Sequence, residues 1–232
     1  MRNRKSTVTI ALLFVLLFLC STAASAHNVS KRDAAFVQSS HGRAIPAFMY
    51  LGAKHMVTGY DHLAFLVGVI FFLYRLKDIV RYVSLFTVGH SVTLLAGVLG
   101  GIHANAYIVD AIIGFSVVYK AFDNIDGFRR FLGFQPNTKI AVLIFGLFHG
   151  FGLATKLQEL DLAKNGLVTN IVSFNVGVEI GQVLALTAVL IALSVWRTHS
   201  GFFRHAFATN IALMTVGFLL TGYQIGGYYL AH

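Results

Sequence analysis

The sequence predicts an all-α membrane protein, a bundle of six transmembrane helices that follows a cleaved signal peptide. Hydrophobic residues make up 56% of the 232 residues and charged residues only 12%, whereas about a quarter of a soluble domain is charged. The mean hydropathy is +0.72. The apolar residues fall into long runs that short basic loops separate, which is typical of a multi-pass membrane protein.

The first 26 residues have the three parts of a secretory signal peptide. Their start is basic, residues 10–19 are apolar, and residues 24–26 (Ala-Ser-Ala) match an A-x-A cleavage site. An uncleaved first helix is the alternative, but the apolar run is short for a membrane span. Cleavage would remove Cys20, the only cysteine, and would exclude disulfides and thiolate-bound metals from the mature chain.

A polar segment, residues 27–44, follows and is predicted to be a short extracytoplasmic tail. Residues 45–232 are predicted to form the transmembrane domain. The first and fifth spans exceed a bilayer core of roughly 30 Å, so they must tilt, kink or project. The six predicted spans are residues 45–74, 82–99, 105–122, 139–156, 168–195 and 208–230.

Basic residues between the spans predict the orientation of the chain. Nine of them lie in the loops 75–81, 120–139 and 197–204, and the opposite loops carry two. Because basic loops stay in the cytoplasm, we expect a multi-pass protein of the inner (cytoplasmic) membrane with both termini on the periplasmic side. The net charge of +9 is dispersed over these loops, so it indicates membrane topology and not nucleic-acid binding.

Ionisable side chains inside the predicted spans are costly in lipid and indicate a functional site. The first span contains HMVTGYDH, residues 55–62. His55 and His62 are seven residues apart and share a helix face, and Gly59 would let the helix bend and gather Asp61 towards them. Imidazole binds zinc, nickel, copper or iron, and Asp61 is either a further ligand or a residue that orients a ligating histidine.

Three other spans each contribute a polar candidate at similar depth. A single histidine has an ordinary explanation, a hydrogen bond to a backbone carbonyl, but candidates on four spans predict one shared polar site. We expect the metal ligands to be His55, Asp61, His62, His90, His149 and Glu179. We expect Thr87, Ser91, Asn175, Gln182 and Asp110 to support them, with an interfacial position as the alternative for Asp110.

Glycines adjoin these candidates and have a packing explanation. Gly146 and Gly150 flank His149, and Gly177 and Gly181 form a small-xxx-small pair in the fifth span. Small residues let membrane helices approach closely. These faces also permit a homo-oligomer, without requiring one.

The motif His55-x5-Asp61-His62 resembles the H-x5-D-H signature of the HupE/UreJ proteins, and FTVGHS, LFHG and FNVGVE resemble the second branch of that family. The resemblance covers most of residues 45–230. It implies a signal peptide, six spans and a nickel or cobalt permease associated with hydrogenase or urease. The second signature of the nickel permeases is FHGxAHGxE. His149 stands at its second histidine, but Phe145 and Gly152 replace its first histidine and its glutamate.

The expected function is transport of a divalent transition metal (nickel, cobalt or zinc), with the metal ion and the lipid bilayer as partners. A membrane-embedded metal-dependent hydrolase is the alternative, because a metal with an open coordination position activates water. A non-catalytic accessory subunit with a hydrogen-bonded polar core is the third possibility. His27 follows the predicted cleavage site and would add a metal-capturing group at the surface.

Overall fold

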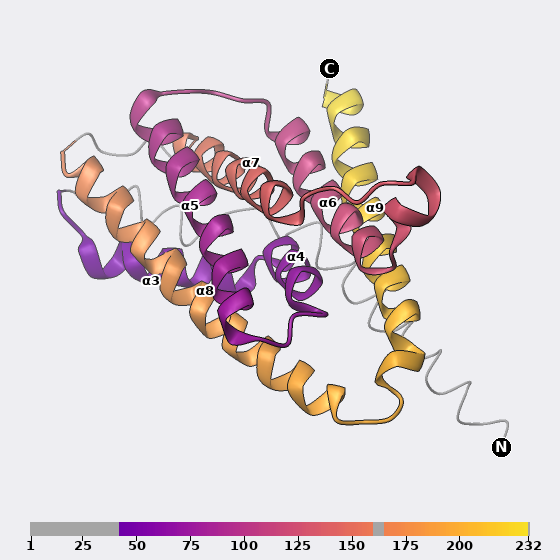
Figure 1. Ribbon diagram of the computed structural model, residues 1–232. Coiled ribbons are helices and arrows are strands. Elements are labelled where there is room, and N and C mark those ends of the chain that lie inside the picture. The colour runs from indigo at the N-terminus through magenta and orange to yellow at the C-terminus, as the bar shows by residue number, and fades with distance from the viewer. Residues whose placement is uncertain (1–41, 160–164, 232) are drawn as a thin grey trace, which may run out of the picture.

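The computed structural model describes residues 42–159 and 165–231, which are helical apart from short connections (Figure 1). The predicted signal peptide, and the predicted tail up to residue 41 with His27, lie outside the described residues. The helices are α3 (Ile45–Thr58), α4 (Tyr60–Ile70), α5 (Leu76–Gly100), α6 (Ala106–Asn124), α7 (Thr138–Gln158), α8 (Leu167–Arg197) and α9 (Phe202–Ala231), with a π-helical turn, η1 (Phe128–Leu132), between α6 and α7.

Four of these helices, α5, α7, α8 and α9, are long and apolar enough to cross a membrane. They confirm an all-helical membrane protein. The predicted count of six spans is not confirmed, because α6 is not among the four and the predicted first span is divided. Its two parts, α3 and α4, have only 14 and 11 residues.

The division of the predicted first span falls at Gly59, where the sequence predicts a bend. Gly59 has extended backbone, with φ −73° and ψ 98°, and separates the end of α3 from the start of α4. A Cβ at this position would lie 3.0 Å from both the His55 carbonyl oxygen and His62 Nδ1, so a side chain would require a shift. The break therefore lies within residues 55–62 and places Asp61 and His62 in the first turn of α4.

The helices associate mainly as three pairs: α3 runs parallel to α8, α5 parallel to α7, and α6 antiparallel to α9 (Figure 1). Glycine lies at the contact in each pair. A Cβ on Gly181 of α8 would lie 2.5 Å from a carbonyl oxygen of α3, and one on Gly89 of α5 would lie 2.6 Å from a carbonyl oxygen of α7. A Cβ on Gly114 of α6 would lie 2.8 Å from a backbone nitrogen of α9. Close packing of this kind holds helices together in lipid.

The glycines that the sequence offers for oligomerisation are used within the chain. Gly146 and Gly150 of α7 lie against the backbone of α5, and Gly177 and Gly181 of α8 lie against the backbone of α3. A homo-oligomer through these four positions would therefore compete with contacts inside the bundle. Oligomerisation stays a prediction.

One end of the bundle is basic. The carboxyl ends of α4, α6 and α8 meet the amino ends of α5, α7 and α9 there, as the bond from Arg197 to the Ile70 carbonyl illustrates. The predicted loops 75–81 and 197–204 are shorter than expected, because α5 already begins at Leu76 and α9 at Phe202. Charged residues are tolerated in the terminal turns of a membrane helix, where long side chains reach the interface. The basic end carries Arg75, Lys77, Arg81, Arg129, Arg130, Lys139, Arg197 and Arg204.

Lys120 lies within α6 and is buried, not in a basic loop as predicted. Its ammonium donates to Asp123 Oδ2 at 2.5 Å and to Asn124 Oδ1 at 2.8 Å. Asn124 in turn donates to the Gly68 carbonyl of α4 at 2.8 Å. The polar group at the basic end, which we call the Lys120 network, consists of Lys120, Asp123, Asn124, Gln135, Thr138 and Asn210.

Replacement of Lys120 by methionine is expected to destabilise the bundle. It would leave the buried Asp123 carboxylate without its cation, and breaking a buried ion pair on one side costs about 3–5 kcal/mol. The double variant Lys120→Met/Asp123→Asn removes both charges and should recover most of the loss. Thermal unfolding of the detergent-purified proteins measures the difference, and equal stability of the single and double variants would contradict it.

Candidate metal centre

Four histidines from four helices meet inside the bundle, and we call them the histidine cluster: His55 of α3, His62 of α4, His90 of α5 and His149 of α7. The His62 ring is central. Its centroid lies 5.3 Å from that of His55, 5.9 Å from that of His90 and 4.8 Å from that of His149. His62, His90 and His149 are buried, and His55 is half-buried. The structure thus brings together histidines that are up to 94 residues apart (149 minus 55) in the sequence.

Local backbone features position these side chains. The break at Gly59 starts α4 one turn before His62, so His62 projects from a helix start and not from mid-helix. Gly150 lets α7 lie directly against the backbone of α5 at His90, and this contact brings His149 and His90 to the same level of the bundle. Glycine is needed at position 150 because a Cβ there would overlap the His90 carbonyl oxygen.

Hydrogen bonds fix which ring nitrogen carries the proton. His149 Nδ1 lies 2.7 Å from the Phe145 carbonyl oxygen. A carbonyl only accepts, so Nδ1 is protonated and Nε2 keeps its lone pair. His62 Nδ1 lies 3.2 Å from Asp61 Oδ1, and an ionised Asp61 selects the same tautomer. Both rings therefore present Nε2 as a metal donor.

The Nε2 atoms of His62 and His90 are buried and have no hydrogen-bond partner among the described residues. Nearly all buried polar atoms in native proteins are hydrogen-bonded, so two such atoms in adjacent rings require an explanation. A metal ion supplies one, because it takes the Nε2 lone pair in place of a hydrogen-bond donor.

Asp61, His62 and His149 each offer one donor atom, and the three atoms lie within 4.8 Å of one another. Donor atoms around a tetrahedral metal with bonds of about 2.0–2.1 Å are about 3.3 Å apart. To bind one ion, these atoms would therefore have to move closer together by up to about 1.5 Å. Imidazole suits zinc, nickel or cobalt, and a carboxylate beside it adds compensating negative charge, so the residues present fit a divalent transition metal.

Glu179, which the sequence predicts as a ligand, is exposed on α8 and lies outside this group. Asn175 and Gln182 are buried on the same helix. At 100° per residue, Glu179 is about 40° further round the helix than Asn175, beyond the edge of the buried face. It shares its side of α8 with the exposed Val176 and Val183.

The predicted supporting residues on α5 and α8 pair with one another. Thr87 donates to Gln182 Oε1 at 3.0 Å, and Asn175 donates to the Ser91 hydroxyl at 3.0 Å. These bonds join α5, which carries His90, to α8. Asn175 Oδ1 and Gln182 Nε2 are buried without a hydrogen-bond partner among the described residues, and polar atoms of this kind accommodate a buried water.

Asp110, the fifth predicted supporting residue, belongs to a different polar group. Its carboxylate accepts from Lys156 of α7 at 2.9 and 3.2 Å and from Gln224 of α9 at 3.5 Å. The ion pair with Lys156 accounts for a buried carboxylate here without a metal.

At the two positions where the chain departs from the nickel-permease signature, Gly152 and Phe145, neighbouring side chains occupy the space. A Cβ on Gly152 would lie 2.9 Å from Ile113 and 3.4 Å from Asp110 Oδ1, so α6 occupies the space that a glutamate at 152 would need. Phe145 packs its ring 5.9 Å from that of Phe65. Neither position contributes a donor atom from its side chain.

Three phenylalanines adjoin the histidine cluster and were not predicted to take part in the site. Phe65, Phe86 and Phe145 are buried, and we call them the phenylalanine layer. Phe65 and Phe86 contact His149, with ring centroids 5.3 and 5.0 Å apart. Their spacing from the histidines was visible in the sequence, but phenylalanine is too common in membrane helices to be a signal by itself.

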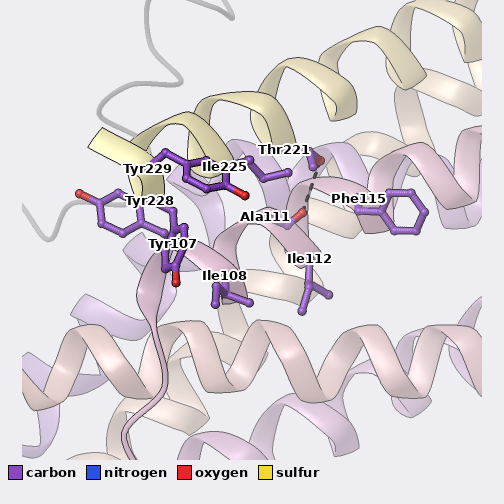
Figure 2. Close-up of a pocket in the computed structure, with 9 residues that line it drawn as sticks. All are labelled: Tyr107, Ile108, Ala111, Ile112, Phe115, Thr221, Ile225, Tyr228 and Tyr229. Atoms are coloured by element: carbon purple, nitrogen blue, oxygen red, sulfur yellow. Dashed lines mark hydrogen bonds between the residues drawn. The ribbon is translucent and has the colours of Figure 1, made fainter. Parts of the chain in front are cut away.

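A groove of about 390 Å³ lies between α6 and α9, on another part of the bundle (Figure 2). Its lining is apolar and aromatic, with Tyr107 and Phe115 from α6 and Ile225 and Tyr228 from α9. Thr221 donates to the Ala111 carbonyl at 3.3 Å inside it. None of its nine lining residues is a histidine, cysteine or carboxylate, so it is not a second metal centre.

The family model described as "HupE / UreJ protein" matches residues 31–232 of the chain, which includes all four histidines of the cluster. The chain belongs to the HupE/UreJ family. The match confirms the resemblance carried by His55, Asp61 and His62. It supports a membrane protein that handles nickel or cobalt, as a transport or accessory protein. No match was found among curated proteins or among solved structures.

Proposed function

We propose that this HupE/UreJ protein is a permease that binds a divalent transition-metal ion, nickel or cobalt, in the histidine cluster and carries it across the inner membrane. One observation supports this most strongly: imidazoles from α3, α4, α5 and α7 converge in the interior of a membrane bundle. Polar groups inside a membrane are costly, and a bound ion would offset that cost.

The ligands in this proposal are the Nε2 atoms of His62 and His149, with His55 and His90 completing the set. Asp61 would orient His62 and contribute negative charge. That charge matters because the amino end of α4 carries a partial positive charge, which opposes a bound cation. Asp61 lies in the first turn of α4, where its carboxylate compensates.

The interrupted helix favours transport over a purely structural role. Transporters often bind their substrates where a membrane helix is broken, because backbone and helix ends are then available inside the bundle. The α3–α4 break at Gly59 lies within the segment that carries His55, Asp61 and His62. A bound ion would therefore lie beside the break between α3 and α4.

Asp61→Asn is expected to weaken metal binding while leaving the fold and the stoichiometry unchanged. Loss of a carboxylate that orients a ligating histidine typically costs about 10–100-fold in affinity. Competition titration of Co²⁺ against a chromophoric chelator measures this. Asp110→Asn is the matched control, because its carboxylate pairs with Lys156. An unchanged affinity in Asp61→Asn, or an equal loss in Asp110→Asn, would contradict the proposed role.

Uptake into proteoliposomes tests transport itself. Vesicles that contain a metal-sensitive dye are exposed to Ni²⁺ or Co²⁺, and the wild type is compared with empty vesicles and with His62→Ala. We expect uptake that requires both the protein and His62. Tight binding by purified protein without any uptake would exclude the permease and favour an accessory metal-binding role.

A further inference from the structure

The phenylalanine layer has a regular relation to the histidine cluster. Each phenylalanine lies about one helical turn from a histidine on the same helix, and always towards the basic end. Side chains three or four residues apart lie one above the other on a helix. The chain therefore stacks a layer of phenyl rings directly on a layer of imidazoles. The pairs are His62 with Phe65 on α4, His90 with Phe86 on α5, and His149 with Phe145 on α7.

The three phenyl rings close the space between their helices. The Phe65 ring is central, with its centroid 5.3 Å from that of Phe86 and 5.9 Å from that of Phe145. Phe65 and Phe86 are 1% exposed and Phe145 is 8% exposed, so the rings fill this level of the bundle. An ion in the histidine cluster would meet these rings on its way to the basic end.

Apolar side chains continue beyond the rings. Val69, Val117 and Val142 are buried in the same core as the three phenylalanines. Beyond them, at the basic end, the side chains are polar again and belong to the Lys120 network. A hydrophobic constriction between two polar regions excludes water and ions, which is how hydrophobic gates block pores.

One short helix carries both a proposed ligand and the central ring of the layer. His62 and Phe65 lie on α4, which is bounded by the Gly59 break at one end. At its other end, Arg197 donates to the carbonyls of Ile70 and Phe71 at 2.5 and 2.7 Å, and these bonds anchor α4 to α8. Movement of α4 would therefore displace the ligand and the ring together.

We propose that Phe65, Phe86 and Phe145 form the closed gate between the histidine cluster and the basic end, and that an ion passes only when these rings separate. The inference rests on the proposed function of the histidine cluster as a metal site. It adds the residues that decide whether a bound ion is retained or released to the other side. Removal of one ring takes away none of the proposed ligand atoms and lowers the barrier.

The test uses Phe65→Ala and Phe145→Ala of the full protein in dye-loaded proteoliposomes, with Co²⁺ as the probe. We expect Co²⁺ uptake to rise about tenfold or more, equivalent to about 1.4 kcal/mol of barrier. Co²⁺ stoichiometry of the purified variants should equal that of the wild type. Phe202→Ala is the matched control, because Phe202 is a buried ring at the basic end that stacks on Phe71. Its uptake should stay at the wild-type rate.

The outcomes separate the gate from the metal site. Normal Co²⁺ stoichiometry with wild-type uptake in both layer variants overturns the gate and leaves the proposed metal site standing. Equal acceleration in Phe202→Ala also overturns it, because general loosening would then explain the flux. If the wild type binds no Co²⁺, the metal site fails and the gate with it. If an alanine variant does not fold, Phe65→Leu or Phe145→Leu takes its place. Leucine keeps more of the side-chain volume than alanine, so we expect a smaller increase in Co²⁺ uptake.

Discussion

His62→Ala is expected to abolish tight metal binding. His62 is the residue of the cluster whose ring lies next to those of His55, His90 and His149. Its removal would take away a donor atom and also a hydrogen-bond partner of Asp61. The affinity should therefore fall by more than the roughly 100-fold upper range seen when only an orienting partner of a ligand is lost. Elemental analysis and Co²⁺ titration of detergent-purified protein measure the change.

The control for this variant is another histidine of the same chain. His205 is exposed on α9, and its Nδ1 contacts the Gly201 carbonyl at 2.7 Å. His205→Ala should keep the wild-type metal content. A His62→Ala protein that is folded and retains wild-type affinity would remove the histidine cluster from consideration as the binding site.

Gly177→Ala is expected to damage the fold more than any exposed substitution. Gly177 of α8 lies against the backbone of Met49 on α3, and a Cβ there would overlap the Met49 carbonyl oxygen. Backbone atoms on both sides cannot rotate away, so α3 and α8 would have to separate. Overpacking of this kind typically costs about 1–3 kcal/mol, occasionally more. Because α3 carries His55, metal binding should weaken as well.

Gly222→Ala provides the matched comparison for this substitution. Gly222 lies on α9, and a Cβ there would have nothing within 4 Å. Alanine favours a helix over glycine by about 1 kcal/mol, so this variant should be as stable as the wild type or more stable. Thermal unfolding and the yield of monodisperse protein in detergent compare the two. Similar behaviour of both variants would contradict the proposed importance of glycine packing.

Much of the helical arrangement follows from the apolar runs of the sequence. The predicted spans 139–156 and 168–195 differ by only one or two residues at each end from α7 and α8. The bend at Gly59 was also predictable, because glycine interrupts a segment that is too long for one span. The starts of α5 and α9 were each placed six residues too late, because charged side chains in the first turns of a helix resemble a loop in sequence.

The candidate site was predictable where an unusual residue type marked it, and not elsewhere. Histidines stand out in apolar helices, and the structure brings the four of them together. Glu179 stands out equally but is exposed. It lies only about 40° round α8 from the buried Asn175, and the sequence of one helix does not determine its orientation in the bundle to that precision. Lys120 could not be distinguished from the loop charges in the sequence, because its polar surroundings depend on α6 continuing to Asn124 and on α9 bringing Asn210 into contact with Asn124.

The central claim, that the histidine cluster holds the metal ion, is tested most directly by X-ray absorption spectroscopy of the purified, Ni²⁺- or Co²⁺-loaded protein. We predict a first shell that contains two to four imidazole nitrogens, at bond lengths near the roughly 2.0–2.1 Å typical of histidine ligation, and the loss of this signal in His62→Ala. A first shell of oxygen atoms alone, or an unchanged spectrum in His62→Ala, would contradict the claim.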